Sequence, residues 1–117
     1  MPGNQLGNRL KAARATVRPK LRDVAWAAGF YEGEGTCFYQ PKTRSIRAVV
    51  NQVEREPLEK MLRWFGGHIY AIPAHHSSKP SWRWVAYGAR ARGVLLTIYG
   101  MLSPKRQGQI RAALAGG

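Results

Sequence analysis

Residues 23–35 read DVAWAAGFYEGEG, an alanine- and glycine-rich stretch with two acids near its end. The stretch predicts a helix, with Asp23 as its N-cap and Gly35 in the left-handed position that follows a helix end. Glycines inside a helix are unusual, since each costs about 1 kcal/mol relative to alanine. A spacing of four places the small residues on one face: Ala25, Gly29 and Gly33. Because small side chains let another backbone approach closely, we interpret this face as a helix-packing surface.

The composition around this stretch is that of a small basic domain. The chain has 117 residues, 44% of them hydrophobic, so we expect one domain with its own core. Nineteen lysines and arginines against six acids give a net charge of +13, which favours a polyanionic partner, nucleic acid first and an anionic membrane second. The single cysteine, Cys37, excludes an internal disulfide and a cysteine-based zinc site within one chain. No apolar run reaches the ~20 residues that span a bilayer, and no short apolar block follows the basic N-terminus. We therefore expect no membrane-spanning segment and no secretory signal, and we take the partner to be nucleic acid rather than a membrane.

The remaining sequence alternates between strand and helix patterns. β-rich runs predict two hairpins, with strands over 36–40, 45–53, 68–72 and 82–87. Apolar residues at helical spacing predict further helices over 56–65, 89–102 and 105–114. The order α-β-β-α-β-β-α-α predicts an α+β fold, in which helices cover one face of a four-stranded antiparallel sheet. The other face would be open, concave and basic.

The second predicted strand indicates what the open face could do. Ile46, Ala48 and Val50 share one side of the strand, which points into the core. The other side carries Ser45, Arg47 and Asn51 together with Val49 and is largely polar and basic. A concave sheet with such a face fits a DNA major groove, where strands reach base edges. The residues expected to contact DNA from strands and loops are Gln40, Lys42, Arg47, Asn51, His75, His76, Lys79 and Arg83. Adjacent histidines in a turn chelate one ion poorly, so we prefer DNA contact to zinc for that pair.

Residues 1–21 form a basic tail ahead of the domain, which we assign to residues 22–117. Residues 1–22 carry six bases and no acid. Three interpretations are open: a basic amphipathic helix that forms on a phosphate backbone, a solvated tail that is disordered or contacts DNA, or an organellar transit peptide.

The segment 27–35, AAGFYEGEG, resembles the LAGLIDADG motif of homing endonucleases. It keeps the Ala-Gly pair, the first acid at Glu32, the small Gly33 and a final acid–glycine pair. The downstream segments VNQ, FGGHIY, WRWVAYG and MLSPKRQGQI follow in an order similar to the family's. The resemblance covers roughly residues 22–115 and identifies the chain as similar to the single-motif members of the family.

The resemblance implies a nuclease that cuts double-stranded DNA at a long pseudo-palindromic site. One motif copy implies half an active site per chain, so the enzyme would be a homodimer whose motif helices pack through the small-residue face. Paired Glu34 carboxylates would then hold a divalent cation, Mg²⁺ or else Mn²⁺ or Ca²⁺. The family also implies catalytic roles for Gln52, near the attacking water, and for Lys105, near the phosphate, with Arg55 or Arg106 as assistants.

Two positions depart from the family pattern, since Glu34 stands where aspartate is commoner and Trp26 where an aliphatic residue is usual. We expect Glu32 to be structural, and Tyr70 and Tyr87 to pack in the sheet rather than to stack on bases. Alternative functions are an intron RNA maturase, and a DNA-binding protein of this fold that does not cleave. A basic ribosomal or architectural protein would not need the EGEG ending. The expected location is the cytoplasm or nucleoid, or an organelle in a eukaryotic host.

Overall fold

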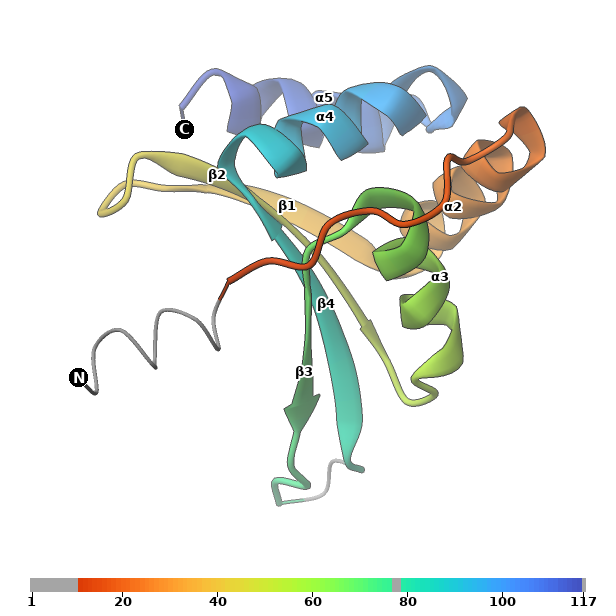
Figure 1. The fold of residues 1–117 in the computed structure, drawn as a ribbon. Coiled ribbons are helices and arrows are strands. Elements are labelled where there is room, and N and C mark those ends of the chain that lie inside the picture. Colours follow the sequence, from red (N-terminus) through yellow and green to blue (C-terminus); the bar gives the residue numbers. More distant parts are fainter. Residues whose placement is uncertain (1–10, 77–78, 117) are drawn as a thin grey trace.

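The computed structural model describes residues 11–76 and 79–116, so predictions that fall on residues 1–10 lie outside the described residues. Its elements in chain order are α2 (Leu21–Glu34), β1 (Gly35–Gln40), β2 (Ser45–Gln52), α3 (Glu56–Phe65), β3 (His68–Ile72), β4 (Ser81–Tyr87), α4 (Gly88–Ile98), the 3₁₀ turn η1 (Tyr99–Met101) and α5 (Pro104–Leu114) (Figure 1). The predicted order α-β-β-α-β-β-α-α is therefore confirmed.

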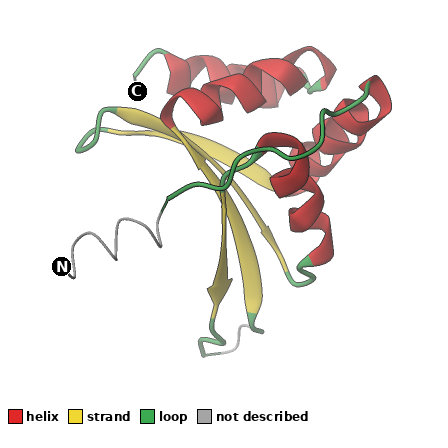
Figure 2. Ribbon diagram, viewed as in Figure 1, coloured by secondary structure: helices red, strands yellow, loops and turns green. Residues whose placement is uncertain are grey.

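The four strands form one antiparallel sheet in the order β1-β2-β4-β3. β2 lies in the middle, where Val50 pairs with Gly35 of β1 and with Trp84 of β4. The helices lie together on one face of this sheet, and none of the described helices covers the other face (Figure 2). This arrangement confirms the predicted α+β class with one open face.

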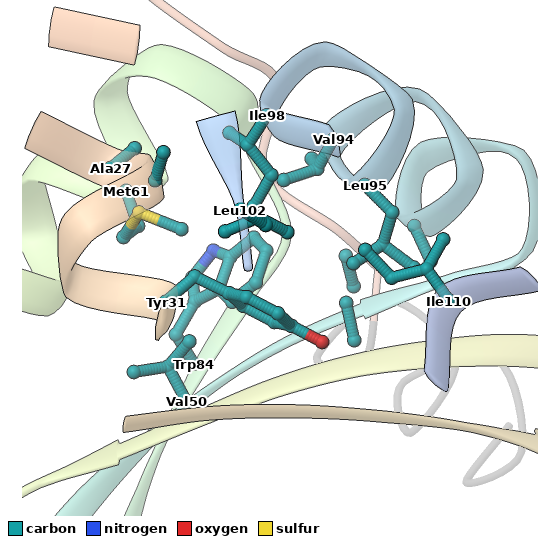
Figure 3. Close-up of a cluster of buried hydrophobic side chains, with 14 of the residues drawn as sticks. Ala27, Tyr31, Val50, Met61, Trp84, Val94, Leu95, Ile98, Leu102 and Ile110 are labelled. Carbon is teal, nitrogen blue, oxygen red and sulfur yellow. The ribbon is translucent and has the colours of Figure 1, made fainter. Parts of the chain in front are cut away.

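The core lies between the sheet and the helices and is centred on Trp84, whose side chain is fully buried (Figure 3). Its indole Nε1 donates a hydrogen bond of 2.8 Å to the carbonyl of Gly66, so the one polar atom of the ring is satisfied. Each helix contributes side chains to the same cluster: Ala27, Tyr31, Leu58, Met61, Leu95, Ile98 and Ile110. The inward-pointing residues of β2 are the predicted Ile46, Ala48 and Val50.

Both ends of α2 differ from the sequence prediction. The N-cap is Lys20, and Asp23 lies in the first turn, where its carboxylate accepts the backbone N–H of Lys20 at 2.9 Å. Gly35 is extended, with φ −89° and ψ 160°, rather than left-handed, and it starts β1 directly. The glycine is needed because a Cβ at this position would lie 2.1 Å from Cδ1 of the buried Tyr31 ring.

Other boundaries shift by smaller amounts. β2 ends at Gln52 rather than at residue 53, and α4 ends at Ile98, after which the chain tightens into η1. Pro104 is the first residue of α5, and the N-cap Ser103 accepts the Arg106 N–H at 3.3 Å. A proline suits this first helical position because its missing N–H would have no partner there. None of the described helices is long and apolar enough to cross a membrane.

Residues 11–20, which we call the arm, precede α2 and contain no helix. Ala13 pairs with Gly67 as an isolated β-bridge, and the N–H groups of Thr16 and Val17 both donate to the carbonyl of Arg63. In this structure these residues lie extended against the end of α3.

Candidate functional site

Strand register decides which side chains point to the open face. Arg47 and Asn51 lie on the same side of β2, and they stand opposite Tyr87 and Arg83 of β4. The four side chains therefore lie close together on the face that the helices leave open. Three of the predicted DNA contacts, Arg47, Asn51 and Arg83, are thus brought into one place.

These side chains line a groove of about 240 Å³, which we call the open-face groove. Its walls come from all four strands: Thr36, Phe38, Arg47, Val49, Asn51, Tyr70, Arg83, Val85 and Tyr87. The groove combines cationic, amide and aromatic groups. Tyr70 and Tyr87, which we expect to pack in the sheet rather than to stack on bases, both line this groove.

The two arginines of the groove are held in different ways. Arg83 Nε donates to Asn51 Oδ1 at 2.8 Å, which fixes the guanidinium beside the amide. The Arg47 guanidinium lies over the Tyr87 ring, 5.0 Å from its centroid. Arg47 Nε is buried without a hydrogen-bond partner among the described residues. A buried, unpaired donor on a cation is costly, so this N–H is ready for an acceptor from outside the chain.

Two titratable rings at the β3 edge stay neutral at ordinary pH. Burial, together with the neighbouring Tyr87 hydroxyl, raises the pKa of Tyr70 to about 12. Burial and the positive charge of Arg90 lower the pKa of His68 below its usual 6.5. The His68 ring stacks on Tyr70 with a centroid distance of 5.7 Å. His68 therefore adds no positive charge to this edge of the open face.

The other predicted DNA contacts lie at the two hairpin ends. Gln40 ends β1 and Lys42 lies in the turn that follows, where the Gln40 amide oxygen accepts the Lys42 N–H at 3.5 Å. His75, His76 and Lys79 lie exposed between β3 and β4, and the two imidazole centroids are 4.1 Å apart. The strands run antiparallel, so the two turns extend the open face at opposite ends of the sheet.

A separate pocket of about 290 Å³ lies where α2 ends, and it is lined by Glu34, Asn51, Gln52, Val53 and Ser81. Glu34 is the last residue of α2, and Gln52 is the last residue of β2. The structure thus brings together two of the three predicted catalytic residues. Gln52 Oε1 accepts the Val53 N–H at 3.0 Å, and the described residues provide no hydrogen bond to the exposed Glu34 carboxylate.

A cluster of polar contacts fixes the backbone on both sides of Glu34. Arg106 donates from Nε to the carbonyl of Glu32 at 3.1 Å and from Nη1 to the carbonyl of Gly35 at 2.8 Å. The Glu32 carboxylate accepts the backbone N–H and the hydroxyl of Ser103, both at 2.8 Å. These two bonds hold the pKa of Glu32 below its usual range. Glu32 is therefore structural, as predicted, and Arg106 binds backbone rather than the pocket.

The third predicted catalytic residue, Lys105, does not line this pocket. It is exposed in the first turn of α5, near enough to Glu32 for its charge to help lower the pKa of that carboxyl. Arg55, the other suggested assistant, forms an ion pair of 2.8 Å with Glu59 and lies over the Trp82 ring at 4.7 Å.

The small-residue face of α2 is open in a single chain. Ala25, Gly29 and Gly33 are exposed, and a Cβ added at either glycine would meet no atom within 4 Å. Leu21 starts the same row at a spacing of four and is 75% exposed. This face therefore has the room for a second backbone that the sequence predicts.

Metal-ligand density in one chain is low. Within the described residues, no group of three or more His, Cys, Asp or Glu side chains could hold a metal ion. Glu34 is the one carboxylate among the residues that line its pocket. A cation here would need further ligands from a nucleic acid phosphate or from a second chain.

Comparisons with known proteins identify the fold. No protein-family model matches the sequence, and no curated protein matches it. Two solved structures are similar: the homing endonuclease I-CvuI in complex with its target in the presence of 2 mM Ca, and I-CvuI in complex with the I-CreI target in the presence of 2 mM Mg, with the DNA not cleaved. In both cases the TM-score is 0.59, the identity is 18%, and the match covers 79% of this chain. The chain spans 65% of the length of I-CvuI, and its fold is that of a homing endonuclease.

Proposed function

We propose that this chain is a site-specific endonuclease that cleaves double-stranded DNA as a homodimer. The observation that carries the proposal is the pocket at the end of α2, which joins Glu34 to Gln52 beside a cationic open face. The fold is similar to that of I-CvuI, whose solved complexes contain target DNA. A homodimer would place two such pockets about a two-fold axis and so match a pseudo-palindromic site.

The open-face groove has the chemistry that reads base edges. Arginine pairs with the O6 and N7 atoms of guanine, and asparagine pairs with adenine. Arg83 and Asn51 stand side by side with a 2.8 Å bond between them, and Arg47 offers an unpaired Nε–H. A ligand with several acceptors at fixed spacing, such as the major groove of duplex DNA, would satisfy these donors.

The dimer would form through the row of small residues on α2. A face that is empty within 4 Å at Gly29 and Gly33 admits a second helix at close range. In such a pair, Glu34 of one chain would lie near the partner subunit's Glu34. The two carboxylates would then share the negative charge needed for a cation that one chain cannot hold alone.

The residues of the pocket fit a hard divalent cation in part. Glu34 supplies an exposed carboxylate without a hydrogen bond from the described residues, and oxygen ligands of this kind suit Mg²⁺ first, with Mn²⁺ or Ca²⁺ as substitutes. When bound, the cation would activate water and stabilise the leaving oxygen. The chain's own contribution is to hold the cation through Glu34, to orient the attacking water through Gln52, and to stabilise phosphate charge through Lys105.

The test is cleavage of a duplex library in Mg²⁺, with the cut ends sequenced and the selected target then used in single-turnover assays. We expect Glu34→Gln to reduce cleavage by roughly three orders of magnitude or more, while target binding survives. Lys105→Met should reduce cleavage less. Glu54→Gln, which removes another exposed acid near Gln52 but outside the pocket, is the matched control and should cleave normally.

Full activity of Glu34→Gln would contradict the site assignment. Specific binding of duplex DNA without cleavage by the wild type would favour a DNA-binding protein of this fold. Preference for a folded intron RNA over duplex DNA would favour a maturase.

A further inference from the structure

The arm is attached to the domain through backbone atoms. Ala13 N–H donates to Gly67 O at 2.9 Å, and Gly67 N–H donates back to Ala13 O at 3.0 Å. Thr16 and Val17 donate to the Arg63 carbonyl at 2.8 and 3.0 Å. These bonds fix the path of the arm and use none of its side chains. The side chains are therefore free to contact another molecule.

The arm packs against Gly66 and Gly67 at the end of α3, which we call the seat of the arm. Gly66 has φ +72°, and a Cβ there would lie 2.4 Å from the carbonyl oxygen of Ala13 and 3.1 Å from the nitrogen of Ala15. Any other residue at this position would displace the arm. Arg90 lies at the same junction, since its Nε would be 3.0 Å from that Cβ. The arm is therefore a defined part of the structure from residue 11 onward.

The arm concentrates positive charge without compensation. Lys11, Arg14, Arg18 and Lys20 are exposed, and residues 11–20 contain no acid. In the part of the chain that the structure describes, the ion pairs are Arg55–Glu59 and Arg106–Glu32, and neither involves the arm. A row of unpaired cations held in an extended path is complementary to a polyanion with regularly spaced charges.

The arm also reaches the border of the open face. Lys11 and Ala13 line a cavity of about 320 Å³ together with His68 and Tyr70, and Tyr70 also lines the open-face groove. Figure 1 shows the arm running from α2 across α3 toward β3. The N-terminal end of the arm therefore meets the open face at the edge strand β3, and the rest of the arm runs along α3.

We propose that the arm is a second phosphate-binding element, which holds the backbone of duplex DNA beyond the segment that lies on the open face. The proposal rests on the proposed function only in that it takes duplex DNA as the polyanion. Contacts to phosphate carry no sequence information, so the arm would add affinity equally for all duplexes.

The test compares two double variants that remove the same charge. Arg14→Gln/Arg18→Gln alters the arm, and Arg92→Gln/Arg111→Gln removes two exposed guanidinium groups from α4 and α5 in the helix layer. Affinity for a duplex of random sequence is measured by fluorescence anisotropy between about 50 and 200 mM KCl. We expect the arm variant to reduce the slope of log affinity against log salt by about 2, since each phosphate contact contributes about one. The control should keep the wild-type slope.

A third variant separates the contribution of the arm's fixed position from that of its positive charge. Ala13→Pro keeps every cation and removes the N–H that bonds to Gly67. We expect it to weaken duplex binding by less than the charge variant does. Unchanged affinity would show that the seat has no role in binding, and would overturn the proposal.

Equal loss in the arm variant and the α4/α5 control would also overturn the proposal, because net charge alone would then explain the effect. Folded RNA and phosphatidylserine vesicles are tested as competitors. The proposal would also be overturned if the arm variant lost affinity only for one of these ligands and kept its affinity for duplex DNA. The assay does not use cleavage. If the protein does not cut DNA but the arm variant still has the smaller salt slope, the proposed nuclease function is contradicted and the phosphate-binding role of the arm is supported.

Discussion

At Gly35 the chain passes from α2 into β1 without a loop, directly over the ring of Tyr31. A methyl group here would lie 2.1 Å from that buried ring. We therefore expect Gly35→Ala to lower the free energy of unfolding by roughly 1–3 kcal/mol, the usual cost of overpacking a core. Urea unfolding measures the change.

Gly93→Ala is the control for this substitution. Gly93 lies in α4, and a Cβ there would meet no atom within 4 Å. The control should gain up to about 1 kcal/mol of stability from helix propensity. A similar effect of the two substitutions would mean that the contact with Tyr31 does not restrict residue 35.

The Glu32 carboxyl should contribute to the way in which the stability of the fold depends on pH. The backbone N–H and hydroxyl of Ser103 hold its pKa below the usual 4.5. A carboxyl of this kind stabilises the fold above its unfolded pKa and loses that contribution as pH falls through the folded value. We expect Glu32→Gln to be less stable than the wild type near neutral pH, and to lose less stability below about pH 4.5.

The measurement is the urea midpoint at a series of pH values. Glu54→Gln removes an exposed acid and is the control, which should follow the wild-type curve. If the urea midpoint of Glu32→Gln falls at acid pH as much as that of the wild type, the hydrogen bonds from Ser103 do not contribute to the pH dependence of stability.

Residue roles were predicted from sequence where the resemblance reached them. The resemblance gave Glu34 and Gln52 as a functional pair, and the fold places them in one pocket. It gave no structural role to Arg106, although this residue holds the carbonyls of Glu32 and Gly35. Those contacts span more than seventy positions in the chain, and local sequence patterns do not encode such pairings.

At the scale of elements, α2 has one face that contributes to the core and one that is empty. Because a side chain at Gly29 would enter open space in the single chain, Gly29→Leu should leave the fold intact. In the proposed dimer the same side chain would occupy the space of the partner helix. We expect Gly29→Leu to sediment as a monomer on target DNA and to lose cleavage.

Gly93→Leu is the control, since its position on α4 is equally empty in the single chain. It should retain the wild-type assembly. If Gly29→Leu still forms the dimer on DNA, the interface lies elsewhere.

The helices and strands differ in how well the sequence predicted them. The prediction for α3 is confirmed at both ends, because Pro57 lies in its first turn and Gly66 follows its last residue. α4 ends before the predicted residue 102, because the backbone tightens into η1 after Ile98. The prediction ran too far because Met101 and Leu102 continue the apolar spacing of the helix. The groove at the open face was not predicted, because the pairing of β3 with β4 brings Tyr70 opposite Arg83, and that register is not visible in either strand alone.

At the scale of the whole molecule, the dominant property is the net charge of +13. Binding of duplex DNA should release condensed counterions from the phosphates that the chain neutralises. Contact with about 6 to 10 phosphates would reduce affinity by about 10³- to 10⁵-fold between 50 and 200 mM salt. Titrations at several salt concentrations test this, and affinity that is independent of salt would exclude a phosphate-dominated interface.

The open-face groove is only partly ionic, since Phe38 and Tyr87 in its walls are 41% and 37% exposed. Removing apolar surface from water lowers the heat capacity of a complex, and this is the robust marker of such burial. A ligand seated in the groove should therefore bind with an enthalpy that becomes more negative as temperature rises. A ligand held only by charge should show little of this change. Calorimetry over a range of temperatures would thus distinguish DNA seated against the sheet from DNA that only neutralises the protein.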